Sequence, residues 1–141
     1  WLHRFRCSHY FTGEKMQISK FSDYAFRALI YLANNMDKLC TVEELAEKLE
    51  TSPHHMKKVI HKLASTDFII SLKGRTGGLR LGLSPEEINL GEVLTFTEEN
   101  LNLFECFSNS NCPMVAGGCK LKAISHAALS KFINEFSKQK Y

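Results

Sequence analysis

The sequence predicts a mainly α-helical fold with a small β-hairpin: a winged helix-turn-helix domain followed by a long C-terminal helix. Three observations predict it. Two short amphipathic helical patterns, between residues 41 and 65, are separated by a tight turn. A basic, glycine-rich turn between two β-favouring runs follows them directly. A regular apolar stripe then continues through residues 120–138.

The first predicted helix, residues 19–32, carries its apolar side chains three or four positions apart, which places them on one face. The next two helices form the helix-turn-helix unit. Thr41 is the expected N-cap of the first, and Glu44 completes a capping box. Ser52 and Pro53 are expected to begin the second helix. Serine is a favourable N-cap, and the N–H that proline lacks would have no partner at the first helical position. This helix is expected to end near Ser65.

The predicted wing consists of a strand at residues 68–70, a turn at 73–78 and a strand at 79–81. Within the turn, Gly77 and Gly78 are expected to permit positive φ and a close backbone approach. A second capping-box pattern begins at Ser84 and predicts a helix that ends near Glu99. The stripe of the last helix comprises Leu121, Ile124, Ala128, Phe132 and Phe136.

Charge is distributed unevenly along the chain. The whole sequence has a formal net charge of +3, but residues 1–15 carry three basic residues and one acidic residue, which leaves 15 basic and 14 acidic residues from Met16 onward. Residues 54–80 hold six basic residues against Asp67 alone, and residues 84–105 hold six glutamates and no basic residue. The first of these segments is therefore the one suited to phosphate groups.

The second helix of a helix-turn-helix unit places its N-terminal turns in the major groove of DNA. Its outer face is expected to present His54, His55 and Lys58 to base edges, and Lys57 and Lys62 to phosphates. Arg75 and Thr76 at the wing tip could reach a minor groove. The full set of predicted contacts with double-stranded DNA is Ser52, His54, His55, Lys57, Lys58, His61, Lys62, Arg75, Thr76 and Gly77.

Composition and length set further bounds. The 141 residues have an ordinary globular composition, with neither a membrane-spanning apolar run nor a secretory h-region, so we expect a cytoplasmic protein without membrane contacts. Residues 1–15 lack clear periodicity and are expected to be a non-native or disordered leader. Residues 16–83 are expected to form the winged helix-turn-helix DNA-binding domain. Residues 84–141 are expected to supply a cluster-binding loop and the helices of a dimer.

Three of the five cysteines lie within one loop, at Cys106, Cys112 and Cys119. An odd cysteine count without a secretory signal disfavours a disulfide framework and favours metal binding. Three thiolates with a proline and two glycines between them suit an iron–sulfur cluster or a zinc ion. Cys40, beside an N-cap and among apolar residues, is expected to be a packing residue.

These residues resemble a known family, the Rrf-type winged-helix iron–sulfur regulators, and most closely their branch that senses nitric oxide. The resemblance rests on Met16-Gln-Ile-Ser-Lys-Phe-Ser-Asp-Tyr-Ala-Phe-Arg-Ala-Leu29, on the wing at residues 74–81, and on the cysteine segment from Glu105 to Lys122. It covers residues 16–141. Six residues separate the last two cysteines where five are usual. Lys122 stands where another branch has a histidine ligand.

The resemblance implies a homodimer that holds a [4Fe-4S] cluster on Cys106, Cys112 and Cys119, with Asp23 of the partner subunit as the fourth ligand. It also implies pairing of the last helices, binding to a palindromic operator, and a transcriptional repressor that releases DNA when nitric oxide nitrosylates the cluster. Alternatives are a redox-sensing or cluster-status-sensing regulator with a [2Fe-2S] cluster, and a zinc-stabilised DNA-binding module. An enzyme is not expected, because no nucleophile is paired with a base and no glycine-rich loop is placed to cradle phosphates.

Overall fold

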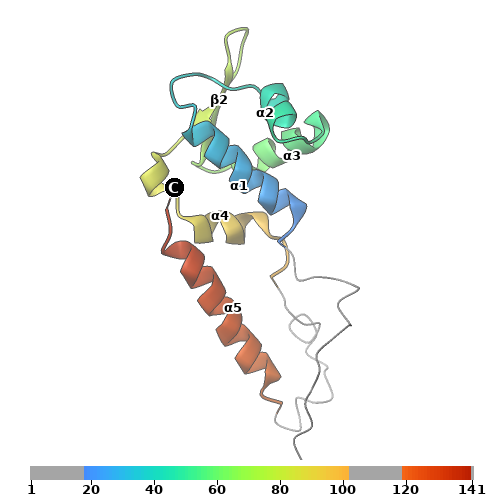
Figure 1. The fold of residues 1–141 in the computed structure, drawn as a ribbon, viewed down its shortest axis with the longest axis vertical. Helices are drawn as coiled ribbons and strands as arrows, with labels where there is room; N and C mark the ends of the chain where they lie inside the picture. Colours follow the sequence, from blue (N-terminus) through green and yellow to red (C-terminus); the bar gives the residue numbers. More distant parts are fainter. Residues whose placement is uncertain (1–17, 102–118, 141) are drawn as a thin grey trace, which may run out of the picture.

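The computed structural model of the chain describes residues 18–101 and 119–140. The predicted leader therefore lies outside the described residues, as do Cys106 and Cys112. The elements, in chain order, are α1 (Lys20–Ala33), α2 (Val42–Lys48), α3 (Pro53–Leu63), β1 (Ile69–Leu72), β2 (Gly78–Leu81), the 3₁₀ helix η1 (Pro85–Glu87), α4 (Leu90–Thr97) and α5 (Leu121–Ser137). The hairpin and α5 lie at opposite ends of the molecule, with α1 and α4 between them (Figure 1).

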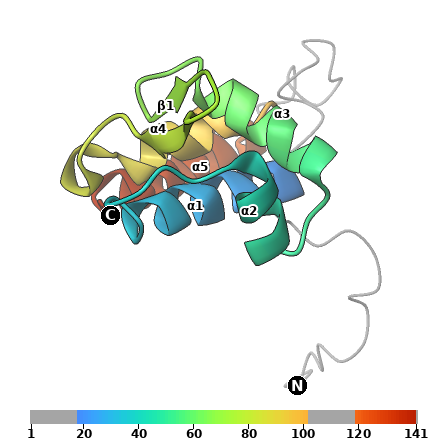
Figure 2. The same ribbon diagram turned by 90° about the horizontal axis from the view of Figure 1, so that it is seen from above.

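Helix α1 supplies part of the buried core. It begins at Ser19, whose side chain accepts a hydrogen bond from the backbone N–H of Ser22 at 3.2 Å. Its buried face carries Ala25, Ala28, Leu29 and Leu32, as predicted, and it packs against α3, α4 and β2. Helices α2 and α3 lie together, on the side of the molecule away from the C-terminal end (Figure 2).

The turn between α2 and α3 is built from backbone hydrogen bonds. The N–H of Thr51 donates to the carbonyl of Ala46 at 2.9 Å, and the N–H of Glu50 donates to the carbonyl of Glu47 at 3.2 Å. This pair of bonds is a Schellman motif, and it requires the left-handed conformation that Glu50 adopts at φ 51°. The Ser52 hydroxyl then accepts from the N–H of His55 and starts α3. The helix ends at Leu63, slightly before the predicted end.

The capping box predicted for α2 is only half formed. The Thr41 hydroxyl accepts from the N–H of Glu44 at 3.1 Å, as expected. The Glu44 carboxylate, however, accepts from the Tyr31 hydroxyl at 2.7 Å and from Lys38 Nζ. These donors lie on α1 and on the loop after it, so the carboxylate ties α2 to α1 instead of capping its own helix. The hydrogen bond from Lys38, and to a smaller extent the one from Tyr31, holds the pKa of Glu44 below its ordinary value.

This depressed pKa predicts a pH dependence of stability. A carboxyl group whose pKa is lower in the folded state contributes stability above its unfolded pKa of about 4.3 and loses it as the pH falls through the folded value. Glu44→Gln should therefore flatten the decline of unfolding free energy between about pH 5 and pH 3. Urea unfolding across this range measures it, with the exposed Glu43→Gln as the matched control. Equal pH slopes in the two variants would show that the Glu44 contacts contribute nothing.

The hairpin is an antiparallel pair in which Ile69 faces Leu81 and Leu72 faces Gly78. The Cys40 backbone adds a bridge to β2, since its N–H donates to Leu79 at 3.0 Å and its carbonyl accepts from Leu79 at 2.7 Å. The backbone N–H and carbonyl of Leu79 are therefore both hydrogen-bonded to Cys40.

The two predicted wing glycines are needed for close approach and not for positive φ. The positive φ, +112°, belongs to Gly74. A Cβ on Gly77 would lie 2.2 Å from the Leu72 carbonyl oxygen, and one on Gly78 would lie 2.8 Å from the Leu39 Cβ. The expectation of close backbone approach is confirmed, and the expectation of positive φ at Gly77 and Gly78 is wrong.

The helix predicted from Ser84 to Glu99 is divided in two. The capping box of Ser84 and Glu87 is present, but it caps the single turn η1. Ile88 then adopts an extended conformation and is fully buried, which breaks the helical path. Helix α4 starts afresh at the N-cap Asn89, whose side-chain oxygen accepts from the N–H of Gly91 at 2.9 Å.

Helix α5 packs on α4 through its C-terminal end. A Cβ on Gly91 would lie 1.9 Å from Ser137 Oγ, so glycine permits this contact. The rings of Phe26 and Phe136 also meet at 6.1 Å. The rest of the predicted stripe is uncovered in the single chain: Leu121, Ile124 and Phe132 are 45%, 63% and 40% exposed.

In the part of the chain that the structure describes, no helix is long and apolar enough to cross a membrane.

Candidate nucleic-acid interface and cysteine loop

The outer face of α3 presents four of the predicted DNA-contacting side chains. His54, Lys57, Lys58 and His61 are all exposed. The opposite face buries Met56, Val59, Ile60 and Leu63 in the core shared with α1 and α2. Because the helix is anchored by apolar packing on one side, its basic side is held at a fixed orientation toward solvent. This is the arrangement that a helix entering a DNA groove requires.

His55 does not lie on this outer face, and that expectation was wrong. Its ring meets the edges of Tyr24 and Phe21 on α1, with centroid distances of 5.3 Å and 6.3 Å. Its Nε2 atom is buried and has no hydrogen-bond partner among the described residues. A histidine held in this way fixes α3 against α1 and is not directed at a base edge.

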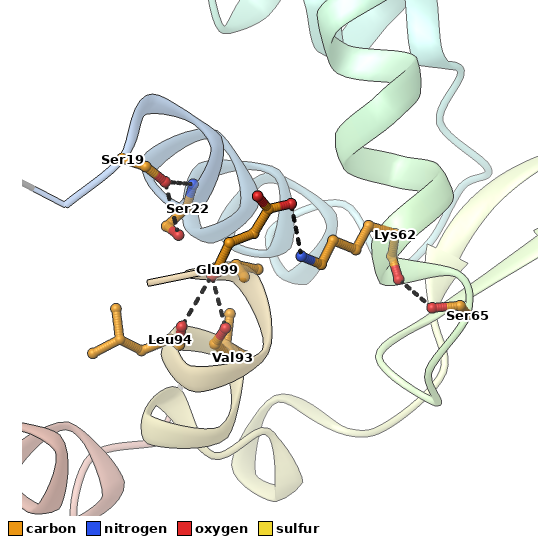
Figure 3. A network of polar contacts seen from close by, with 8 residues as sticks. Ser19, Ser22, Lys62, Ser65, Val93, Leu94 and Glu99 are labelled. Atoms are coloured by element: carbon orange, nitrogen blue, oxygen red, sulfur yellow. Dashed lines mark hydrogen bonds and ion pairs between the residues drawn. The ribbon is translucent and has the colours of Figure 1, made fainter. Parts of the chain in front are cut away.

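Lys62 has the same orientation, because it lies two helical turns after His55 and so shares its flank of α3. Its Nζ lies 5.4 Å from the Phe21 ring centroid and 5.6 Å from the Phe96 ring centroid. It also approaches Glu99 Oε1 at 4.0 Å (Figure 3). The structure therefore directs Lys62 toward α1 and α4, and not toward the outer face with Lys57 and Lys58.

The wing tip provides a second basic surface. Arg75 and Thr76 are exposed, as are Lys73 and, on β2, Arg80. Gly77 is half-buried, and its N–H donates to the Gly74 carbonyl at 3.1 Å, so its backbone closes the turn. Ser52 is exposed while its hydroxyl oxygen caps α3, which leaves the hydroxyl proton available to a phosphate oxygen.

Asp23 lies in the first turn of α1, where its carboxylate pairs with Arg27 one turn later. Arg27 Nε lies 3.0 Å from Asp23 Oδ2, and the side chains of Arg27 and Asp23 are 55% and 47% exposed. An exposed pair of this kind is weak and can exchange partners. Asp23 also lines a hollow of about 320 Å³ together with Ile18, Lys20, Phe26 and Phe136. Sequence reasoning missed Arg27, although its i,i+4 spacing from Asp23 was a usable signal.

The two cysteines that the structure describes differ sharply. Cys119, directly before α5, is exposed, whereas Cys40 is fully buried. Burial raises the pKa of the Cys40 thiol, which makes it a poor ligand and a poor nucleophile. The expectation that Cys40 is a packing residue is confirmed. Within residues 18–101 and 119–140, no three histidine, cysteine or carboxylate side chains are grouped as a metal site.

Comparison with known proteins places these features in context. Residues 18–140 match the family model Rrf2, described as an iron-dependent transcriptional regulator. The chain is 42% identical over 120 residues to the HTH-type transcriptional regulator NsrR of Shouchella clausii, covering 84% of this chain and 80% of that protein. It is 37% identical to NsrR of Bacillus subtilis, over 84% and 82% of the two chains. The solved structure of T. potens IscR has the same fold, with a TM-score of 0.68 at 17% identity over 89% and 82%.

Proposed function

The chain belongs to the Rrf2 family of transcriptional regulators, and from this premise we propose that it is a DNA-binding repressor that senses nitric oxide. It senses the gas through a labile iron–sulfur cluster and releases its operator when that cluster is nitrosylated. The observation that carries the proposal is the 42% identity to a regulator named NsrR. The match to the Rrf2 family model spans residues 18–140, which include Asp23 and all three loop cysteines. The relatives are transcriptional regulators, in agreement with the expectation that the chain is not an enzyme.

In this proposal, DNA is held by α3 and the wing tip. His54, Lys58 and His61 are exposed donors on the outer face of α3, and Lys57 is placed for a phosphate. Arg75 and Thr76 extend from the wing toward an adjacent groove. His55 and Lys62 are left out of this set, because both pack against α1.

The donor set fits an iron–sulfur cluster. Cys106, Cys112 and Cys119 offer three thiolates within one loop, and the described member, Cys119, is exposed and free to bind. The partner subunit would supply the Asp23 carboxylate as the fourth ligand. A bound [4Fe-4S] cluster would supply an oxygen-ligated iron, which is held more weakly than the thiolate-ligated irons and is open to nitric oxide.

Asp23 has two alternative partners in this scheme. It either reaches the loop of the other subunit or remains paired with Arg27 of its own chain, 3.0 Å away. Asp23 lies in the first turn of α1, and α1 packs on α3, so a change of partner at Asp23 acts on the position of α3. A dimer binds two half-sites at fixed separation. A shift of the two α3 helices therefore weakens the contacts with both half-sites.

A dimer is supported by α5. Its uncovered apolar side chains lie on one stripe, and a second copy of the same helix is the natural cover for them. A dimer is also what the proposed ligand set requires, because Asp23 of one subunit would bind at the loop of the other.

Spectroscopy of anaerobically purified protein tests the cofactor. We expect a broad visible absorption with about four irons and four sulfides per chain for a [4Fe-4S] cluster. About two of each would instead support the redox-sensing or cluster-status-sensing alternative with a [2Fe-2S] centre. Zinc without acid-labile sulfide would contradict the proposal and support a zinc-stabilised DNA-binding module.

A further inference from the structure

Three helices and the start of the cysteine loop meet at the Lys62 ammonium group. Its Nζ lies between the Phe21 ring of α1 and the Phe96 ring of α4, at 5.4 Å and 5.6 Å from their centroids. Glu99 lies two residues after the end of α4, and its carboxylate approaches the Lys62 ammonium group (Figure 3). The Lys62 side chain is only 30% exposed, so most of its aliphatic stem is covered as well.

The two aromatic rings provide the main hold on Lys62. A cation within about 6 Å of a ring centroid is attracted by the ring face, and partial burial strengthens this attraction. The Glu99 carboxylate is 91% exposed and lies at the outer limit of an ion pair, so screening by water makes its contribution small. To reach a DNA phosphate on the outer side of α3, Lys62 would have to leave both rings.

The last residue of α4 and the segment after it, residues 97–101, are attached at a second point. The backbone N–H of Ser19, the N-cap of α1, donates to Glu98 Oε1 at 2.7 Å. The Thr97 hydroxyl is buried and donates to the Val93 carbonyl at 2.8 Å, which fixes the end of α4. This segment, which we call the loop stem, therefore connects directly to the start of α1. It continues from Phe96, the residue of α4 whose ring holds Lys62 of α3.

We propose that Lys62 makes no contact with DNA and is a positioning residue that fastens the recognition helix to α1 and to the end of α4, from which the loop stem continues. A displacement of the cysteine loop would then reach α3 within the same chain, through residues 97–101, the end of α4 and Lys62. This route is separate from the route through Asp23 of the partner. The inference rests on the proposed function in taking α3 as the recognition helix and the cysteine loop as the part that is displaced.

Two measurements on three variants test this proposal. The variants are Lys62→Met, Lys62→Arg and Lys57→Met. Lys57→Met is the matched control, because it removes an exposed charge from the same helix. The first is the salt dependence of binding to a random-sequence DNA duplex. Each phosphate contact contributes about one to the slope of log affinity against log salt. We expect Lys57→Met to reduce this slope by about 1 and Lys62→Met to leave it unchanged.

The second measurement is amide hydrogen exchange of the free protein. We expect Lys62→Met to accelerate exchange about 2- to 30-fold in the loop stem and the last turn of α3. Lys62→Arg should restore the wild-type rate, because arginine also stacks on aromatic rings, and Lys57→Met should have no effect.

A slope reduced by about 1 in Lys62→Met would overturn the inference, and so would unchanged exchange in the stem. Failure of the wild-type protein to respond to nitric oxide would instead count against the proposed function. Failure to bind the duplex would do the same, and the exchange measurement alone would then decide the role of Lys62.

Discussion

Replacing Cys119 by alanine should abolish the visible absorption of the anaerobically purified protein and remove its bound iron and sulfide. Cys119 is exposed and lies directly before α5, so the substitution removes the proposed ligand without disturbing the core. A cluster that has lost one of three thiolates is not expected to survive purification. Operator affinity should fall with it, by about 5- to 150-fold if the coupling is of ordinary size.

Cys40→Ala is the matched control for this substitution. The Cys40 thiol is fully buried, and its removal should cost about 1 kcal/mol of stability while iron, sulfide and operator affinity stay at wild-type levels. Circular dichroism and metal analysis of both variants complete the comparison. Retention of a full iron complement by Cys119→Ala would contradict the ligand assignment.

The substitution Ile124→Glu should convert the proposed dimer to a monomer. Ile124 is 63% exposed in the single chain, so the charge does not disturb the fold of the subunit. In the proposed interface, however, the carboxylate would be desolvated among apolar side chains of both copies. Operator affinity should fall by about 100- to 10,000-fold, because the second half-site no longer adds to the first. Sedimentation velocity and titration of the operator measure the two effects.

Asn134→Glu adds the same charge to the same helix as a control. Asn134 is exposed and lies ten residues after Ile124, which places it about 80° around the helix from Ile124 and farther from the rest of the apolar stripe. We expect it to remain a dimer with nearly wild-type affinity. If Ile124→Glu also remained a dimer, α5 would not be the interface.

The elements that the sequence predicts well are those determined by local signals. Ser19, Thr41 and Ser52 cap α1, α2 and α3 as serine and threonine do in isolated helices. The glycine-rich turn also forms the expected hairpin. The sequence did not predict the division at Ile88, because the burial of that side chain depends on the rest of the core.

The side chains that were placed wrongly are those whose partners come from distant elements. Glu44 satisfies the local pattern of a capping box, but Tyr31 and Lys38 compete successfully for its carboxylate. His55 and Lys62 lie at the boundary between the outer and inner faces of α3. Their direction is decided by aromatic rings on other helices, which helical periodicity alone does not reveal.

The measurement that tests the central claim most directly is the operator affinity of the cluster-loaded dimer before and after exposure to nitric oxide. The DNA is a duplex selected from a random library by the loaded protein under anaerobic conditions. The proposal predicts a fall in affinity of at least about 10-fold, within the usual range of allosteric coupling, and no change in Cys119→Ala. Equal affinity of the loaded protein before and after nitric oxide would contradict it.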